Sequence, residues 1–309
     1  MDFGGKDDKG DFMTRVAEEL HRIGCECVPG FSMSRYTSMR VGGAVEMIVY
    51  PKSVDDLINV LKKLSLLGIK STVLGAGSNT IIDDEGIEGV VVSTKKMRGI
   101  HILENGKILA EAGAVLGTIL NKTIRAGLSG FEFVAGIPGT VGGGIFMNAG
   151  ANDGEIKDVV EKVWVWVDGK EMILFRDEIV FEYRKCHLPE GGVVTRALFG
   201  LKPGRSDESE RRVKEYLDKR SKTQPITMSN SGSIFKNPPE IPAGKLLEEL
   251  GLKGFSIGGA RFSELHANFI VNSKNAKASD VIRLIELAKK EALSRRGIDL
   301  ETEVKIIRK

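Results

Sequence analysis

Glycine is concentrated in one apolar stretch of this chain. Residues 127–150 read GLSGFEFVAGIPGTVGGGIFMNAG and hold eight glycines in twenty-four residues. A flexible linker would be rich in Ser, Lys and Glu, whereas apolar side chains such as Phe131, Val141 and Ile145 separate these glycines. Glycine in such surroundings indicates a backbone that turns at positive φ or closely approaches another group. That group is either a phosphate-bearing cofactor held by backbone N–H groups or the neighbouring backbone of a tightly turned β-core.

Length and charge narrow the class of protein. The chain has 309 residues, 41% of them hydrophobic, which is enough for a substantial core and indicates two domains. Its net charge is +3, and no long basic run suits nucleic acid. Residues 205–222 are densely charged but mixed in sign, so they predict a solvated helix.

The cysteines and the apolar runs indicate a compartment. Cys25, Cys27 and Cys186 are too few for a disulfide framework, and the first two are spaced neither for zinc nor for a redox CxxC pair. We therefore expect free thiols in a reducing cytoplasm. No apolar run is long enough to span a bilayer, and residues 1–12 lack the apolar core of a signal peptide. A cytoplasmic protein without membrane insertion is expected.

Hydrophobic periodicity predicts an α+β protein. Strands dominate the first two-thirds of the chain, and helices alternate with strands in the last third, which favours a cofactor domain with a smaller domain appended. Pro203-Gly204 marks the boundary, so we expect a cofactor-binding region at 1–204 (lobes about 1–95 and 96–204) and a second domain at 205–309. Predicted helices are 13–24, 54–68 (capped by Ser53), 116–126, 205–222, 243–250 and 279–296; predicted strands are 45–50, 72–74, 90–93, 100–103, 107–111, 163–167, 171–175, 193–201, 269–271 and 300–307, with hairpin turns at 105–106 and 168–169.

The common nucleotide and metal motifs are absent. The run GAGSNT at 75–80 begins like a dinucleotide-binding fingerprint but has Thr80 in place of the third glycine. None of the Gly-Lys pairs is followed by the Ser or Thr of a P-loop, and the four histidines form no HExxH motif or other metal-ligand spacing. We therefore expect no metal.

Three glycine-containing loops suit a diphosphate. They lie at 40–43, 75–79 and 136–143, each beside a predicted strand. Backbone N–H groups would bind the phosphates, and the hydroxyls of Ser78 and Thr140 and the amide of Asn79 would add directed hydrogen bonds. The candidate cofactor-binding residues in these loops are Arg40, Gly42, Gly43, Gly75, Ala76, Gly77, Ser78, Asn79, Gly136, Ile137, Pro138, Gly139, Thr140, Gly142 and Gly143.

A series of motifs carries a family resemblance. RVGG, LGAGSN, GIPGTVGGGIFMNAG, FEYR, SGSIFKNP, GLKG, GGARFSELHANFIVN and LETEV occur in that order over roughly residues 30–307. The series resembles UDP-N-acetylenolpyruvoylglucosamine reductase, the MurB flavoprotein family of peptidoglycan synthesis. The resemblance implies FAD in a two-lobed fold of the vanillyl-alcohol oxidase/PCMH type, NADPH as reductant, and a UDP-sugar with an enolpyruvyl ether as substrate, bound by a smaller α+β domain. It adds Asn148 and Ala149 of MNAG to the flavin site.

Some details of the series vary within the family. The short connection after FEYR, from Arg184 to Val193, resembles the family's shorter subtype. Ala76 stands where the family commonly has glycine, and Leu265 where it often has lysine. The family has a last strand that returns toward the active site, and this chain ends it in Arg308-Lys309 rather than at a glycine.

The implied reaction assigns three catalytic residues. Hydride transfer to the vinyl carbon leaves negative charge on the substrate carboxylate, which needs a cation, and the neighbouring carbon then needs a proton. Arg184 matches the family's arginine that polarises the carboxylate, since a guanidinium suits that bidentate task; the alternative is a surface arginine. Ser233 matches the proton donor, although it could equally be a turn-forming serine. Glu303 matches the glutamate that assists the arginine, and would need protonation in an apolar pocket; strand alternation alone would put it with Glu301 on a solvated face.

Three further residues are candidates for binding the substrate. Asn237 matches a substrate-binding asparagine, Lys236 could meet a phosphate, and His266 falls at a family position near the substrate, though a lone histidine can be structural. Trp164 and Trp166 alternate in a hairpin strand and are predicted to pack. Two other functions stay open: an FAD oxidase that uses oxygen, and a nucleotide-sugar sensor without catalysis.

Overall fold

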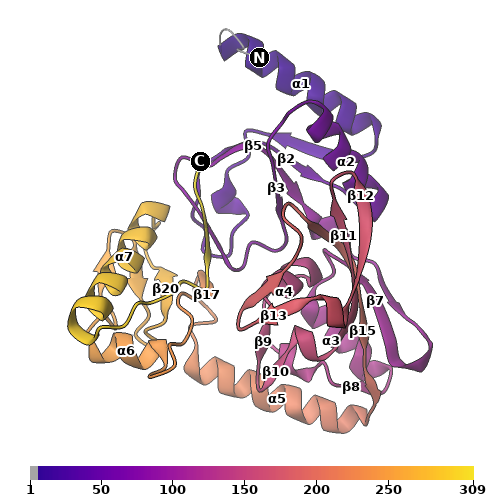
Figure 1. Cartoon of the computed structure of the whole chain (residues 1–309). Helices are drawn as coiled ribbons and strands as arrows, with labels where there is room; N and C mark the ends of the chain where they lie inside the picture. The colour runs from indigo at the N-terminus through magenta and orange to yellow at the C-terminus, as the bar shows by residue number, and fades with distance from the viewer. Residues whose placement is uncertain (1–5) are drawn as a thin grey trace. The chain divides into compact units, whose positions relative to one another are not determined.

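The chain consists of two compact units. A computed structural model describes residues 6–309 (Figure 1). Unit 1 comprises 6–31, Val45–Gly75 and Glu88–Ser209; unit 2 comprises Ser32–Ala44, Ala76–Ile87 and Glu210–Lys309. One boundary falls between Gly75 and Ala76, inside a predicted cofactor loop, and another falls inside a helix, between Ser209 and Glu210.

The first part of unit 1 is a four-stranded sheet with two helices. Its strand order is β1-β2-β5-β3. Helix α2 begins as predicted, because Ser53 Oγ accepts a hydrogen bond from Asp56 N at 3.1 Å, and it ends before Gly68, whose φ is 66°. The apolar side of α2 and the inner face of the sheet form one buried core. The elements are α1 (Lys6–Arg22), β1 (Glu26–Pro29), β2 (Val45–Tyr50), α2 (Val54–Leu66), β3 (Ser71–Leu74) and β5 (Ile87–Ser93).

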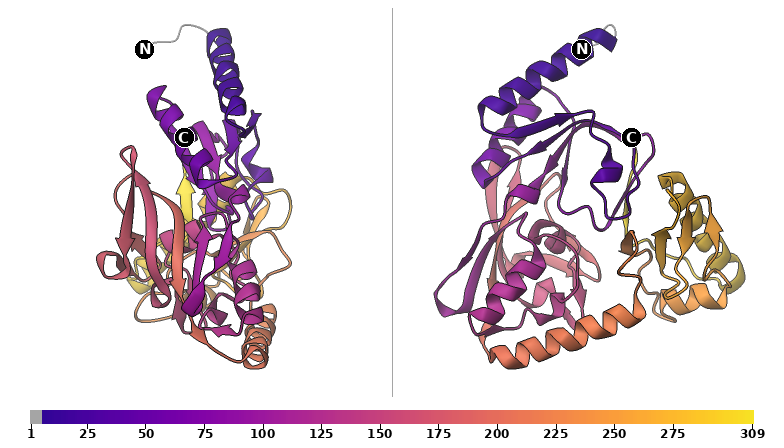
Figure 2. Two further views of the ribbon diagram at one scale, coloured as in Figure 1. Left: turned by 90° about the vertical axis from the view of Figure 1, so that its right-hand side faces the viewer. Right: turned by 180° about the vertical axis from the view of Figure 1, so that it is seen from behind.

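The second part of unit 1 is a five-stranded antiparallel sheet of order β12-β11-β15-β7-β6. Both predicted hairpin turns are confirmed: Asn105 and Gly106 have φ of 58° and 74°, and Asp168 and Gly169 have φ of 49° and 77°. The side view in Figure 2 shows β11 and β12 as a long reddish ribbon. The elements are β6 (Ile100–Ile102), β7 (Lys107–Glu111), α3 (Leu116–Arg125), α4 (Val141–Phe146), β11 (Val160–Val167), β12 (Lys170–Phe175) and β15 (Val193–Gly200).

Short strand pairs and one long helix complete this region. Strand β8 (Leu128–Ser129) pairs with β16 (Lys202–Pro203), β9 (Gly150–Ala151) with β10 (Gly154–Glu155), and β13 (Val180–Glu182) with β14 (Lys185–His187). Helix α5 (Ser206–Thr223) buries Ser209 and exposes most of its other residues, so the predicted solvated helix is confirmed. Trp164 and Trp166 pack as predicted, each beneath a cationic side chain.

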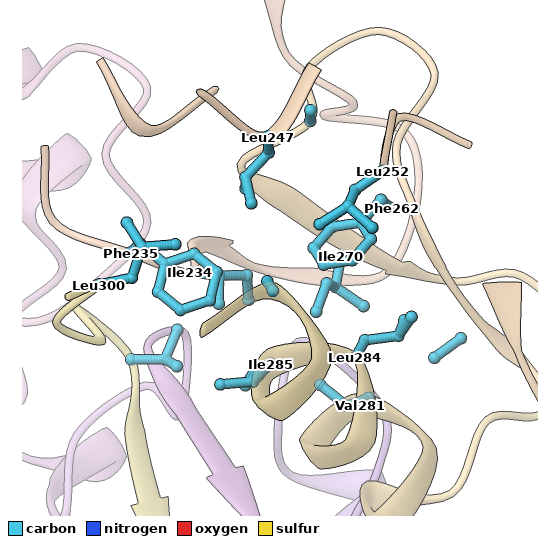
Figure 3. Packing of buried hydrophobic residues seen from close by; sticks show 14 of the residues in the cluster. Ile234, Phe235, Leu247, Leu252, Phe262, Ile270, Val281, Leu284, Ile285 and Leu300 are labelled. Atoms are coloured by element: carbon cyan, nitrogen blue, oxygen red, sulfur yellow. The ribbon is translucent and has the colours of Figure 1, made fainter. Parts of the chain in front are cut away.

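Unit 2 is built on a second antiparallel sheet, of order β17-β20-β19-β18. Helix α7 lies against it (Figure 1), and their apolar side chains form the core shown in Figure 3, where Ile234 and Phe235 lie beside Leu300. The elements are β17 (Asn230–Ser233), α6 (Ala243–Glu249), β18 (Ser256–Ile257), β19 (Ala260–Phe262), β20 (Phe269–Asn272) and α7 (Ala278–Arg296), with β4 (Thr80–Ile82) parallel to β21 (Lys305–Ile307).

One predicted strand is shorter than expected, and one helix was missed. The strand expected at 300–307 is regular only at Lys305–Ile307, because Leu300 and Val304 both turn into the core while Thr302 bridges Phe235. Helix α4 was not expected, since glycine is a poor helix former. It forms because Gly142 lets the helix pack closely: a Cβ atom there would lie 3.2 Å from Ala112 Cβ.

Cys25, Cys27 and Cys186 are buried free thiols, as expected, and burial raises the pKa of Cys25 to about 11 and those of the other two to about 12. Across residues 6–309, no helix combines the length and apolarity needed to cross a membrane. Over the same range, no group of three potential metal-ligating side chains gathers.

Candidate active site

The glycine-rich loop of unit 1 holds a polar atom that is buried without a partner. Thr140 is 2% exposed, and no described residue forms a hydrogen bond with its Oγ1. A Cβ atom at Gly75 would lie 2.4 Å from this oxygen, and one at Gly143 would lie 3.9 Å from it. The hydroxyl therefore lies between two backbone positions that carry no side chain.

Such an oxygen fits the predicted cofactor. Leaving a buried hydroxyl unsatisfied costs about 1–3 kcal/mol, so an orphaned one indicates a ligand or a water molecule. A phosphate oxygen would accept its proton: the missing side chain at Gly75 makes room for the hydroxyl itself, and the bare backbone at Gly143 leaves room for a close approach. The residues present thus fit the diphosphate of FAD.

The loop is fixed by main-chain hydrogen bonds. Val141 N donates to Ala114 O at 2.9 Å, and Gly142 N donates to Ala112 O at 2.8 Å. These bonds tie the loop to the segment that precedes α3 and give Thr140 a defined position. Because the N–H of Gly142 is already used, this glycine contributes closeness of packing and not a phosphate donor.

Asn148 connects the glycine-rich segment to the hairpin β13–β14. It is fully buried, and its Nδ2 donates to Glu155 Oε2 at 2.9 Å and to Glu182 O at 3.0 Å. Its Oδ1 accepts a hydrogen bond from Lys157 N at 3.1 Å. The candidate flavin residue Asn148 is thus the support of the hairpin that carries Arg184. Ala149 follows it and donates its N–H to Gly144 O at 2.8 Å.

Arg184 occupies a strained turn. The pair Glu182–Lys185 closes a two-residue hairpin, in which Arg184 has a φ of 56°. This backbone conformation is uncommon for a residue other than glycine and costs about 1 kcal/mol or more. The side chain is 18% exposed, with Nη1 3.9 Å from Glu155 Oε1 and the guanidinium 4.9 Å from the ring of Tyr183. It is therefore not a solvated surface arginine, and Glu155 is a supporting residue that the sequence analysis missed.

The loop at 40–43 lies in unit 2, and its glycines serve the chain's own packing. Arg40 has a φ of 58° and Gly42 a φ of 127°. A Cβ atom at Gly43 would lie 2.1 Å from Asp84 O, and the N–H of Gly43 donates to Asp83 O at 2.9 Å. The alternative that needs no ligand thus accounts for Gly43.

The loop at 76–79 joins two other predicted site segments within unit 2. Ser38 Oγ donates to Asn230 O in β17 at 2.6 Å and lies 3.4 Å from Ser78 O, while Gly77 turns at a φ of 70° against Tyr36. Asn79 Nδ2 donates to Glu303 O at 3.2 Å. This loop is therefore held between β17 and the C-terminal segment.

Ser233 and Glu303 are brought together by the same arrangement. Glu303 N donates to Ile234 O at 2.8 Å, directly after Ser233. The side chain of Glu301 is 71% exposed, as expected for a solvated face, whereas Glu303 is half-buried. Within unit 2 the structure thus places Asn79, Ser233 and Glu303 at one junction. Arg184 and Thr140 belong to unit 1.

The three predicted substrate residues have partners inside unit 2. Lys236 is 14% exposed and forms an ion pair with Glu301 at 2.6 Å. Asn237 Oδ1 accepts a hydrogen bond from Ala243 N at 3.0 Å at the start of α6. His266 Nδ1 accepts from Asn268 N at 3.2 Å, and burial lowers the pKa of the imidazole below its ordinary value.

Comparison with known proteins first defines the class. A family model described as FAD binding domain matches residues 45–173, and one described as UDP-N-acetylenolpyruvoylglucosamine reductase, C-terminal domain, matches residues 224–307. With the orphaned Thr140 hydroxyl, these matches define a flavoprotein.

Relatives define the family. UDP-N-acetylenolpyruvoylglucosamine reductase of Caldanaerobacter subterraneus subsp. tengcongensis is 44% identical over 89% of this chain and 91% of that protein. The protein of the same name from Caldicellulosiruptor bescii is 42% identical over 93% of each chain. The crystal structure of UDP-N-acetylenolpyruvylglucosamine reductase (MurB) from Thermus caldophilus covers 91% of this chain and 98% of its own, with a TM-score of 0.79 and 36% identity.

The chain belongs to the UDP-N-acetylenolpyruvoylglucosamine reductase family. The predicted family, the α+β fold with an FAD-binding region of the vanillyl-alcohol oxidase/PCMH type, and the class of FAD- and NADPH-dependent oxidoreductase are confirmed.

Proposed function

We propose that this chain reduces the enolpyruvyl group of UDP-N-acetylenolpyruvoylglucosamine to give UDP-N-acetylmuramate, and that Arg184, Ser233 and Glu303 carry the chemistry. The observation that supports it best is the junction in unit 2. There the backbone of Glu303 binds Asn79 of a predicted cofactor loop on one side and Ile234, next to Ser233, on the other. Two candidate catalytic residues and a candidate cofactor residue from distant parts of the chain therefore share one hydrogen-bonded framework.

The cofactor residues hold and orient FAD. When bound, FAD supplies hydride transfer from NADPH to the double bond of the substrate. The Thr140 hydroxyl donates to a phosphate oxygen, since it lacks any other acceptor among the described residues. Gly75 makes room for this hydroxyl, Gly143 allows the diphosphate to approach it, and Ser78 and Asn79 supply polar groups for FAD.

Arg184 binds the substrate carboxylate. Reduction of the double bond pushes negative charge onto that carboxylate, and a guanidinium with low solvent exposure stabilises it more strongly than an exposed one. The contact to Glu155 at 3.9 Å is longer than a hydrogen bond and orients the guanidinium.

Ser233 donates the proton and Glu303 supports the developing charge. A serine hydroxyl is a weak acid and donates to carbon only where water is excluded. Ser233 is partly buried at the end of β17, beside the apolar core that contains Ile234 and Phe235. Lys236, Asn237 and His266 contribute binding of the UDP-sugar.

The remaining assignments complete the proposal. Residues 1–204 bind FAD and residues 205–309 bind substrate, apart from the C-terminal segment, which contributes Glu303. The protein works in the cytoplasm in peptidoglycan precursor synthesis. It acts on a small molecule, without nucleic acid, membrane insertion or an obligate protein partner.

A spectroscopic experiment tests the function. Purified protein should be yellow, its flavin absorbance should bleach with NADPH, and it should recover when the enolpyruvyl substrate is added without oxygen. Bleaching without recovery would remove the substrate assignment, peroxide formation without any need for NADPH would indicate an oxidase, and a colourless protein that binds UDP-sugar would indicate a sensor. Arg184→Ala and Ser233→Ala should keep the flavin and slow the recovery step; near-normal recovery in either would disprove that residue's role.

A further inference from the structure

Asn268 binds the backbone that follows Ser233. It lies just before β20 and is 3% exposed. Its Oδ1 accepts a hydrogen bond from Phe235 N at 2.9 Å, and its Nδ2 donates to Phe235 O at 2.8 Å. Its own carbonyl accepts from Ile234 N at 2.8 Å. Three hydrogen bonds therefore join Asn268 to two consecutive residues.

The side chain of Asn268 replaces a missing strand partner. Strand β17 ends at Ser233, which pairs with Phe269 in β20, and the chain then diverges from that strand. Phe235 is 1% exposed, so both of its buried backbone groups require partners. A carboxamide offers one acceptor and a donor, as a peptide group does, and Asn268 satisfies both groups at once.

We call the hydrogen bonds between Asn268 and residues 234–235 the Asn268 clamp. The C-terminal segment is bonded to the same stretch of backbone, directly after Ser233. On one side of Phe235, Ile234 O accepts the hydrogen bond from Glu303 N; on the other, Lys236 N donates to Glu301 O at 2.9 Å. Figure 3 shows Ile234 and Phe235 pointing into the core next to Leu300. These two hydrogen bonds attach the C-terminal segment to the residues on either side of Phe235, so a shift of Phe235 also shifts Glu303.

We propose that Asn268 is a positioning residue for the reduction of substrate. It holds the segment that carries Ser233, and with it the bonded segment that carries Glu303, at the start of β20, without touching substrate or cofactor itself. The inference rests on the proposed function, because it assigns Asn268 to the proton-transfer step. Displacing a reacting group by about 1 Å can cost on the order of 100-fold in rate, so the clamp has a measurable consequence.

Rate constants of the two half-reactions test the proposal. Asn268→Asp keeps the acceptor and the shape but removes the donor to Phe235 O, and Asn268→Ala removes both. In flavin-loaded variants, bleaching by NADPH should proceed at close to the wild-type rate constant, while reoxidation by the enolpyruvyl substrate should slow roughly 10- to 100-fold. The solvent deuterium isotope effect on reoxidation should increase, since proton transfer from Ser233 becomes more limiting. A purely structural role would lower the amount of loaded protein and not the rate constant per bound flavin.

A matched control separates positioning from loss of stability. Ile285 lies in the same core, on α7, and is 2% exposed. Ile285→Val should destabilise unit 2 slightly and leave both rate constants and the isotope effect unchanged. Amide hydrogen exchange without substrate should show Phe235 and Glu303 exchanging faster in the Asn268 variants and not in Ile285→Val.

The outcomes distinguish this inference from the proposed function. If wild-type protein is not reoxidised by the enolpyruvyl substrate, the proposed function fails, whereas the exchange experiment still tests the clamp. If wild type is reoxidised and the Asn268 variants match it in rate constant and isotope effect, the positioning role is wrong. If neither variant retains flavin, Asn268 is a folding residue and the inference is also overturned.

Discussion

The side-chain amide of Asn79 donates to the carbonyl oxygen of Glu303 at 3.2 Å, although the two residues are 224 positions apart in the sequence. Lys305 N donates in return to Asn79 O at 3.0 Å, and from there β21 runs parallel to β4. Asn79 thus ends a candidate cofactor loop and begins the attachment of the C-terminal segment. The two roles are coupled, because whatever shifts this loop also shifts Glu303.

Asn79→Ala should loosen that attachment. A hydrogen bond of this kind contributes about 1 kcal/mol, so we expect the free energy of unfolding to fall by about that amount and bound flavin to dissociate faster. Urea unfolding and the rate of flavin release measure the two effects. Asn121→Ala, at an exposed position on α3, is the control and should change neither. Equal flavin release from both variants would show that the Asn79 side chain does not couple the segments.

Thr140→Val tests the orphaned hydroxyl. Valine has nearly the same shape, and no hydrogen bond within the described chain is lost, so the flavin-free protein should be at least as stable as wild type. Affinity for FAD should fall by roughly tenfold, because one donor to the diphosphate is gone. Thr123→Val is the matched control, since Thr123 Oγ1 is buried and donates to Leu120 O at 2.7 Å. It should lose stability and keep FAD affinity, the reverse of the result at Thr140.

Much of the fold follows from local signals in the sequence. The Ser53 cap, the Gly68 stop and the turns at 105–106 and 168–169 act within a few residues, and all four are confirmed. Helix α4 and the irregular segment 300–304 were mispredicted because both depend on distant contacts: Gly142 against Ala112, and Leu300 in the core beside Ile234. Tertiary packing overrides propensity at these places.

The candidate site was predictable from the sequence only in part. The glycine loops and Arg184 could be named from motifs, but the strained turn at Arg184 could not, because no nearby glycine or proline marks it. Glu155 and Asn268 were missed, since a lone acid and a lone asparagine in the sequence carry no information about which backbone they support. Only the structure shows that they hold Arg184 and Phe235.

Comparing Arg184→Gly with Arg184→Ala isolates the strain in that turn. Both variants lose the guanidinium and its contact with Tyr183, so both should be reoxidised by substrate more slowly than wild type. Alanine at this position still carries the cost of a positive φ, whereas glycine adopts a positive φ freely. The free energy of unfolding of Arg184→Gly should therefore be about 1 kcal/mol higher than that of Arg184→Ala. Chemical denaturation decides between them. Equal stability would mean that the hairpin relaxes when the arginine is removed.

Asp84 makes the stability of unit 2 depend on pH in the acidic range. Its Oδ1 and Oδ2 accept hydrogen bonds from Ala278 N at 2.8 Å and Ser279 N at 3.0 Å, so this distant carboxylate caps the first turn of α7. Partial burial alone would raise the pKa of the carboxyl, but the hydrogen bonds from the Ser279 side chain and from the two amides, with Lys277 nearby, hold it below its ordinary value. A lowered folded pKa stabilises the protein above the unfolded value of about 3.9, and this stabilisation is lost as pH falls through the folded pKa.

Asp84→Ala should therefore lower the free energy of unfolding at pH 7. The loss should be only about 0.5 kcal/mol, because the carboxylate is exposed and screened by solvent. The difference in the free energy of unfolding between variant and wild type should vanish as pH falls below the folded pKa of Asp84. Thermal unfolding from pH 7 to pH 3 measures the difference, with Glu85→Ala in the same exposed loop as control. A difference that stays constant with pH would show that the cap acts through shape and not through the charge of Asp84, because only the charged form gains from the two amides and Lys277.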